Sequence, residues 1–256
     1  MKDFRLDSQR VLISGGSKGI GAAIAVTLAE AGADIGVIGR DREGLNRVQR
    51  LVESNRRSCS VIEADLTSIA GARRAGEQAL EISPHWDVLV NNAGIAKVKP
   101  VLEISQEEWS ETFDVNLRAV LLLSQVIVPQ MINRGRGKVV NISSIGGFFG
   151  TPGFAAYGAS KAALNQLTRT MAVEWGPSNI QVNAICPTVI LTDMGHDLWD
   201  NPSMQDLRKD KQKRIPLGRF GEPRDVANVA LFLASAASDF LNGVSLPLDG
   251  GMMISP

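Results

Sequence analysis

A glycine-rich turn near the start of the chain separates a short apolar run from a stretch with helical periodicity. The run is 11–13, and the turn reads Ser14-Gly15-Gly16-Ser17-Lys18-Gly19-Ile20-Gly21. Glycines let the backbone approach a pyrophosphate closely, and the helix that follows directs its amides and positive dipole end at the anion. The spacing is Gly-x-x-x-Gly-x-Gly. The turn is not a Walker loop, because it does not end in Gly-Lys-Ser/Thr. The turn therefore predicts a dinucleotide site.

Short apolar runs alternate with longer amphipathic stretches along the rest of the chain. The predicted strands are apolar throughout, and they cover residues 11–13, 34–38, 60–64, 87–90, 138–142, 180–185 and 244–248. The predicted helices cover residues 21–31, 42–54, a stretch ending near 82, and 155–175. This alternation predicts an α/β fold, a parallel sheet with helices on both faces. Strands without polar alternation are typical of strands covered on both sides.

The composition argues against several kinds of partner. With 27 basic and 27 acidic side chains, no net charge attracts nucleic acid or an anionic membrane. We find no apolar signal region and no unbroken apolar run of membrane-spanning length, so we expect a soluble cytoplasmic protein. Cys59 and Cys186 are expected to be reduced thiols, and His85 and His196 are too isolated to predict a metal site.

The end of the second predicted strand bears on the choice of dinucleotide. Arg40 stands there and Lys18 projects from the glycine turn, and two cations favour the 2′-phosphate of NADP(H). Asp41 favours NAD(H), because an acid about 20 residues past the glycine turn can accept a hydrogen bond from a ribose hydroxyl. Residues 40–42 also suit a charge cluster at a helix entry. We predict NADP(H), with NAD(H) as the alternative.

Two further strand ends fit a dinucleotide site. Asp65 and Leu66 follow the third predicted strand and are expected near the adenine. Asn92, Ala93 and Gly94 follow the fourth, where small residues permit close backbone approach to a ribose. Either segment also suits an ordinary turn.

The only tyrosine of the chain, Tyr157, lies four residues before Lys161 on a predicted helix. Side chains so spaced share one face of the helix. A phenol loses its proton near a pKa of about 10, and a nearby ammonium favours the phenolate and lowers that pKa. Such pairs also arise by chance, but beside a dinucleotide site this one predicts proton transfer to or from an oxygen.

Together these segments resemble the short-chain dehydrogenase/reductase family over nearly the whole chain. The matching pieces share the family's order and separations, and they are the 14–21 turn, 91–94, Asn116, Ser144 thirteen residues before Tyr157, Tyr157-x-x-x-Lys161 and Pro187-Thr188. The resemblance implies a single-domain Rossmann fold over residues 1–256, with a doubly wound seven-stranded parallel sheet. It also implies hydride transfer with a nicotinamide cofactor and a homotetramer.

The resemblance also implies a role for each matching side chain. Tyr157 is the general acid/base, and Lys161 lowers its pKa and binds the nicotinamide ribose. Ser144 donates a hydrogen bond to the substrate oxygen, and Asn116 helps to anchor a water that links Lys161 to solvent. The adjacent Ser143 is the alternative to Ser144, which we prefer on its spacing to Tyr157. Neither serine has a neighbouring histidine that would make it a nucleophile.

Departures from the family pattern indicate one branch. The family usually has Thr in place of Ser14 and Pro-Gly in place of Pro187-Thr188. The segments 187–189 and 191–195 resemble L-xylulose (dicarbonyl) reductases and tetrameric carbonyl reductases. That branch uses NADPH, and the resemblance places Pro187 and Val189 at the cofactor.

Residues of about 188–216 interrupt the alternation and are predicted to form a substrate lid, with 208–214 as a solvated charged helix. Candidate pocket residues, each of which also suits core or subunit packing, are Ile145, Phe148, Phe149, Phe154, Val189, Met194 and Trp199. This apolar set without a fixed cation predicts a neutral ketone, diketone or sugar-like substrate.

The alternatives are an NAD-dependent polyol or sugar dehydrogenase, a 3-oxoacyl-thioester reductase whose carrier protein contacts 208–214, and a catalytically silent nucleotide-binding regulator. An epimerase would need a second domain.

Overall fold

The computed structural model of the protein describes residues 2–192 and 205–255. The strands of these residues form one seven-stranded parallel sheet in the order β3-β2-β1-β4-β5-β6-β7. The strands are β1 (Arg10–Ser14), β2 (Asp34–Gly39), β3 (Cys59–Glu63), β4 (Val88–Asn91), β5 (Gly137–Ile142), β6 (Ile180–Pro187) and β7 (Ser245–Leu248). The predicted α/β Rossmann fold is confirmed.

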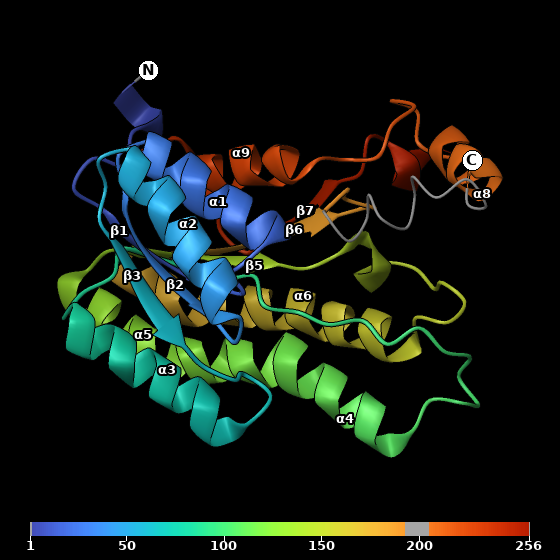
Figure 1. Ribbon diagram of the computed structural model, residues 1–256, viewed down its shortest axis with the longest axis horizontal. Helices are drawn as coiled ribbons and strands as arrows, with labels where there is room; N and C mark the ends of the chain where they lie inside the picture. Colours follow the sequence, from blue (N-terminus) through green and yellow to red (C-terminus); the bar gives the residue numbers. More distant parts are fainter. Residues whose placement is uncertain (1, 193–204, 256) are drawn as a thin grey trace.

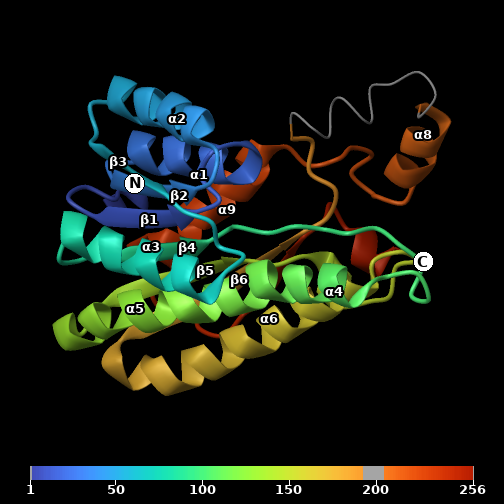
Figure 2. The same cartoon turned by 60° about the horizontal axis from the view of Figure 1, so that its bottom comes forward.

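Helices cover both faces of the sheet (Figures 1 and 2). One layer holds α1 (Gly19–Glu30), α2 (Arg42–Ser54) and α9 (Pro223–Ala234), and the other holds α3 (Ile69–Ile82), α4 (Gln106–Phe113), α5 (Ala119–Arg134) and α6 (Ala155–Trp175). Successive side chains of a strand point to opposite faces. Val11 and Ile13 of β1 therefore join the core beneath α1, whereas Leu12 joins the core beneath α3 and α5. This double burial explains the unbroken apolar runs.

The chain reverses direction across the sheet between β1 and β4. It runs outward from β1 through β2 to β3 and then crosses back to β4, on the other side of β1. In open α/β sheets, ligands bind outside the carboxyl ends of the strands at such a switch point. The residues after β1 and β4, which include the glycine turn and Asn92 to Gly94, meet at this position.

Helices α4 and α5 are joined by the π-helical segment η2 (Asp114–Arg118), which gives a continuous helix from Gln106 to Arg134. By length and composition alone this helix could cross a membrane. More than half of its most apolar window is buried in the protein. Because Leu123, Ile127 and Met131 pack in the core, this is a core helix whose apolar character serves packing.

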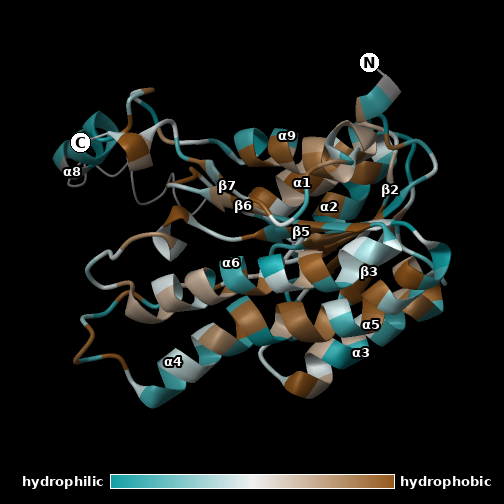
Figure 3. Ribbon diagram, turned by 180° about the vertical axis from the view of Figure 1, so that it is seen from behind, coloured by the Kyte–Doolittle hydropathy of each residue, from teal (hydrophilic) through white to brown (hydrophobic). Residues whose placement is uncertain are grey.

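Helix α8 (Gln205–Lys213) stands apart from both layers and is largely hydrophilic (Figures 2 and 3). It confirms a helix in the charged stretch 208–214. Residues 193–204 lie outside the described residues, so the lid stays a prediction. The short 3-10 segments are η1 (Lys2–Phe4), η3 (Ile145–Gly147), η4 (Gly176–Ser178), η6 (Ala236–Ser238) and η7 (Met252–Ile254).

Candidate active site

The glycine turn connects the end of β1 to the start of α1 in a conformation that requires glycine. Gly15 and Gly19 have φ values of +67° and +57°, which side chains disfavour. A Cβ at Gly21 would lie 2.2 Å from the Gly15 carbonyl oxygen, so the turn closes on itself only without that atom. The amides at the start of α1 are thereby exposed at the switch point, as an anion site requires.

Ser14 and Asn92 join the ends of β1 and β4. The Ser14 hydroxyl accepts hydrogen bonds from the backbone amides of Asn92 (3.1 Å) and Ala93 (3.2 Å). The Asn92 side-chain amide donates to the carbonyls of Ser14 (3.1 Å) and Gly15 (2.9 Å). Ser14 is buried, so its hydroxyl shapes the site without facing the cavity.

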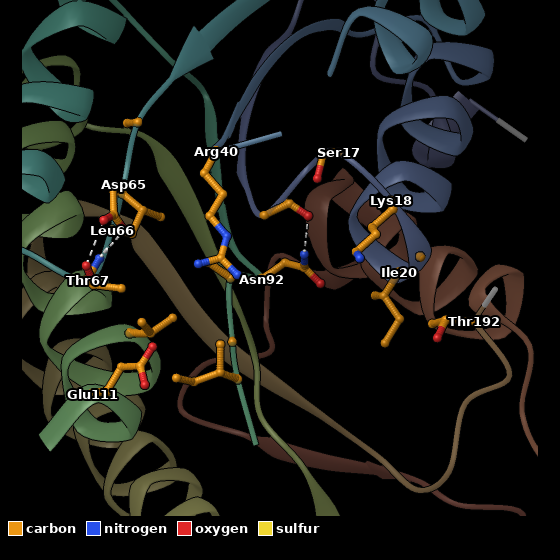
Figure 4. Close-up of a pocket in the computed structure, with 18 residues that line it drawn as sticks. Ser17, Lys18, Ile20, Arg40, Asp65, Leu66, Thr67, Asn92, Glu111 and Thr192 are labelled. Atoms are coloured by element: carbon orange, nitrogen blue, oxygen red, sulfur yellow. Dashed lines mark hydrogen bonds between the residues drawn. The ribbon is translucent and has the colours of Figure 1, made fainter. Parts of the chain in front are cut away.

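A cavity of about 350 Å³ opens at this switch point (Figure 4). Most of the predicted cofactor residues line it, namely Gly15, Ser17, Lys18, Gly19, Ile20, Arg40, Asp65, Leu66, Asn92, Ala93 and Gly94. The Asp65 carboxylate accepts hydrogen bonds from the amide (3.0 Å) and hydroxyl (2.9 Å) of Thr67, and these bonds lower the pKa of Asp65. The predicted cofactor residues Ser14 and Gly21 do not line this cavity.

The three residues at the tip of β2 point in different directions. Arg40 extends into the cavity, where Lys18 also lies (Figure 4). Asp41 instead caps α2, and its carboxylate accepts the Gly44 amide at 3.0 Å. Arg42 pairs with Glu63 at 3.8 Å. The helix-entry interpretation therefore holds for Asp41 and Arg42, whereas Arg40 faces the cavity without an ion pair among the described residues.

A second cavity, of about 470 Å³, adjoins the first and shares part of its wall. The shared residues are Ile20, Asn92, Gly94, Ile95 and Thr192. The second cavity is lined by the predicted residues Ser144, Tyr157, Lys161, Pro187 and Val189. The fold thus brings the predicted dinucleotide residues and the Tyr157 group to one continuous cleft.

Asn116 lies in the π-helical segment η2 and is fully buried. Its side chain accepts from the Ile95 amide (2.8 Å) and donates to the Ile95 carbonyl (2.9 Å) and the Ser160 hydroxyl (3.0 Å). Ser160 in turn donates to the Tyr157 carbonyl at 2.7 Å. A π-bulge often marks a functional site, and here it ties the loop after β4 to the start of α6.

Burial dominates the electrostatics of Tyr157 and Lys161. Burial raises the pKa of Tyr157, and the nearby hydroxyl of Ser144 acts in the opposite direction. Burial lowers the pKa of Lys161 to about 8. Its ammonium donates to the Ile142 carbonyl at 2.8 Å and lies 5.6 Å from the centre of the Tyr157 ring. Burial thus dominates the pKa of Tyr157 here, and a lowering of that pKa by Lys161, which the resemblance implies, stays a prediction.

The two adjacent serines have different neighbours. Ser143 donates its hydroxyl to the backbone carbonyl of Lys161 at 3.2 Å. Ser144 accepts the Gly146 amide at 3.0 Å and lies close enough to Tyr157 to affect its pKa. This arrangement supports the choice of Ser144 over Ser143.

The walls of the second cavity correct the substrate prediction in part. Ile145, Phe149, Phe154 and Val189 line it, whereas Phe148 faces a separate groove. Met194 and Trp199 lie outside the described residues. The cavity also has lining residues that were not among the named pocket candidates, including Thr151 and Met252, and Thr188, Thr192 and Lys211 from the predicted lid segment. Because one of them is a lysine on α8, the expectation of no fixed cation is wrong.

The family assignment follows from the chain's similarity to known proteins. A family model described as enoyl-(acyl carrier protein) reductase matches residues 15–253. The chain belongs to this family of short-chain dehydrogenases/reductases, and it is accordingly an oxidoreductase that transfers hydride between a nicotinamide and a carbonyl or alcohol carbon.

Individual relatives differ in what they act on. L-xylulose reductase from Bos taurus is 40% identical over 252 residues, which cover 98% of this chain and 99% of that protein. An NAD-dependent glycerol dehydrogenase from Listeria innocua serovar 6a is 36% identical over 253 residues, covering 99% and 97%. The crystal structure of a gluconate 5-dehydrogenase from Burkholderia cenocepacia J2315, in complex with NADP and tartrate, has a TM-score of 0.91 and 35% identity, covering 100% of this chain and 99% of that one.

Proposed function

We propose that this protein is an NADP(H)-dependent reductase of ketones on polyhydroxylated, sugar-like substrates. One observation carries the cofactor assignment: Arg40 and Lys18 line the first cavity, whereas Asp41 is engaged as the cap of α2. A guanidinium pairs well with a 2′-phosphate. The acid that would have favoured NAD does not line the cavity. The names of some relatives specify NAD and those of others NADP, so the choice of cofactor rests on the residues of this chain.

The second cavity supplies the groups that carbonyl reduction needs. A nicotinamide bound in the adjoining cavity would supply the hydride. Negative charge then develops on the substrate oxygen, and the Ser144 hydroxyl is placed to stabilise it. Tyr157 gives its phenolic proton to that oxygen, and its raised pKa keeps the proton in place at neutral pH. The Lys161 ammonium favours the phenolate that remains.

Turnover of a small substrate panel tests this proposal. The full-length enzyme is mixed with a ketose, a keto acid, a diketone or an acetoacetyl thioester, each with NADPH or NADH, and the loss of nicotinamide absorbance is followed. We expect NADPH oxidation with a sugar-like ketone. Absence of turnover with every pair would favour the silent-regulator alternative, and preference for NADH would refute the role of Arg40. Reduction of the thioester alone would favour the 3-oxoacyl alternative.

The pH dependence of reduction should report on Lys161, whose pKa is about 8. The ammonium form predominates below that pKa and is lost as the pH rises through it. We therefore expect kcat/KM for ketone reduction to be level at neutral pH and to fall above about pH 8, since neutral Lys161 no longer favours the phenolate. Lys161→Arg should move this break to higher pH if the variant stays active. A profile without a break between about pH 7 and pH 9 would contradict this role.

The homotetramer, the cytoplasmic location and the predicted lid stay predictions. The roles of Asn116 at a water, and of Pro187 and Val189 at the cofactor, belong to the same proposal. Their support is that Asn116 is locked beside the cleft and that Pro187 and Val189 line the second cavity.

A further inference from the structure

The substrate cavity contains a lysine that the proposed chemistry does not use. Lys211 lies on α8 and lines the cavity together with Ser144 and Tyr157. The residue is half-buried. Its helix is largely hydrophilic and stands apart from the helix layers (Figures 2 and 3). A lysine that lines a ligand cavity can bind an anionic group of the ligand through charge-assisted hydrogen bonds.

The charges around this cavity are one-sided. Among the described residues, the charged side chains that line it are Lys161 and Lys211, and no aspartate or glutamate is among them. Lys161 is engaged with the Ile142 carbonyl. On the same helix as Lys211, Lys213 forms an ion pair with Asp210 at 3.1 Å. The side chain of Lys211 forms no ion pair or hydrogen bond with a partner within residues 2–192 and 205–255.

Apart from the Asn92 amide, the remaining polar side chains of the wall are hydroxyls. Thr151, Thr188 and Thr192 line the cavity with Ser144, and the rest of the wall is mostly apolar. Hydroxyl side chains can donate to and accept from the hydroxyls of a polyol chain. A cavity with this wall and one uncompensated ammonium suits a polyhydroxylated molecule that carries one anionic group.

We infer that Lys211 binds a carboxylate of the substrate, so that the enzyme acts on sugar acids in preference to neutral ketoses. This inference rests on the proposed function, since it assigns the substrate class of the same cavity. The carboxylate is bound at α8 while the carbonyl to be reduced lies at Ser144 and Tyr157. Family membership does not decide the point, because the names of the relatives cover both neutral and acidic substrates.

Two matched ligand pairs test the inference. The first pair is 5-keto-D-gluconate and L-sorbose, which share one ketone skeleton. The keto acid carries a carboxylate where L-sorbose carries a hydroxymethyl group. We expect kcat/KM with NADPH to be higher for the keto acid. Lys211→Gln should lower the keto acid value by about ten- to a hundredfold, mainly through KM, and lower the L-sorbose value much less, as expected for loss of one charge-assisted hydrogen bond. Lys211→Arg should restore most of the preference, and Lys213→Gln, the control on the same helix, should not alter it.

Equilibrium binding separates this inference from the proposed function. With NADPH bound, gluconate and D-glucitol cannot react, and calorimetry measures their affinities without turnover. Tighter binding of gluconate by the wild type, lost in Lys211→Gln, would support the carboxylate site even if neither ketone were reduced. Equal affinities for the two ligands, or an unchanged preference in Lys211→Gln, would overturn it even in an active reductase.

Discussion

Tyr157→Phe is expected to lower kcat for ketone reduction by about 10²–10⁴-fold, the range typical of a lost general acid. The change removes one oxygen and keeps the ring, which packs edge-on against Phe154 with centroids 6.0 Å apart. We therefore expect the fold to persist and NADPH to bind within about twofold of the wild-type affinity, because no charge is gained or lost. Stopped-flow or steady-state turnover and NADPH fluorescence titration measure the two quantities.

A second hydroxyl in the same cavity provides the control for Tyr157→Phe. Thr151 also lines the wall, but it has no assigned role in proton transfer. Thr151→Val should retain kcat within a few fold while removing a hydroxyl from the same space. Near-wild-type kcat in Tyr157→Phe, or an equal loss in both variants, would contradict the assignment of the proton donor.

Arg40→Asp is expected to shift the ratio of kcat/KM for NADPH over NADH toward NADH by about a hundredfold or more. A charge-assisted hydrogen bond contributes about 1.5–3 kcal/mol, and the new carboxylate both removes that bond and repels the 2′-phosphate. In NADH the same carboxylate would accept a hydrogen bond from the ribose hydroxyl. The measurement is kcat/KM for each cofactor at a fixed saturating ketone concentration.

Arg42→Asp makes the same change of charge two residues further on. Arg42 pairs with Glu63 and does not line the cavity, so this variant should keep the wild-type cofactor preference. If Arg42→Asp shifted the cofactor preference as far as Arg40→Asp does, the shift would come from the change in local net charge. It would then not come from loss of a direct contact between Arg40 and the 2′-phosphate. An unchanged ratio in Arg40→Asp would refute the contact.

Features that arise from local sequence were predicted well. The strands, the glycine turn and the helix that carries Tyr157 and Lys161 all depend on residues close together in the chain. Several limits differ from the prediction by one or two residues, such as the start of α1, the start of β3 and the end of β6, since limits of helices and strands are the least certain part of an assignment. Helices α4, α5 and α9 were not assigned, and the π-helical segment around Asn116 gives no periodic signal.

Other features depend on contacts between distant segments. Whether Asp41 faces a ribose or caps α2 is decided by its direction at the strand tip, where Gly44 supplies the partner amide. The pKa of Tyr157 rises because residues from several elements exclude water from it, which the four-residue spacing to Lys161 does not reveal.

The sequence by itself determined the layered parallel sheet and the position of the glycine turn, because apolar periodicity and glycine requirements act over a few neighbouring residues, and it supplied the candidates for the reacting side chains. Only the tertiary structure decided which cations face the cleft. Arg40 and Lys211 stand far apart in the chain and each lies among other charged residues. The positions of β2 and α8 place Arg40 and Lys211 in the walls of the two cavities, whereas Arg42 and Lys213 form ion pairs at the surface.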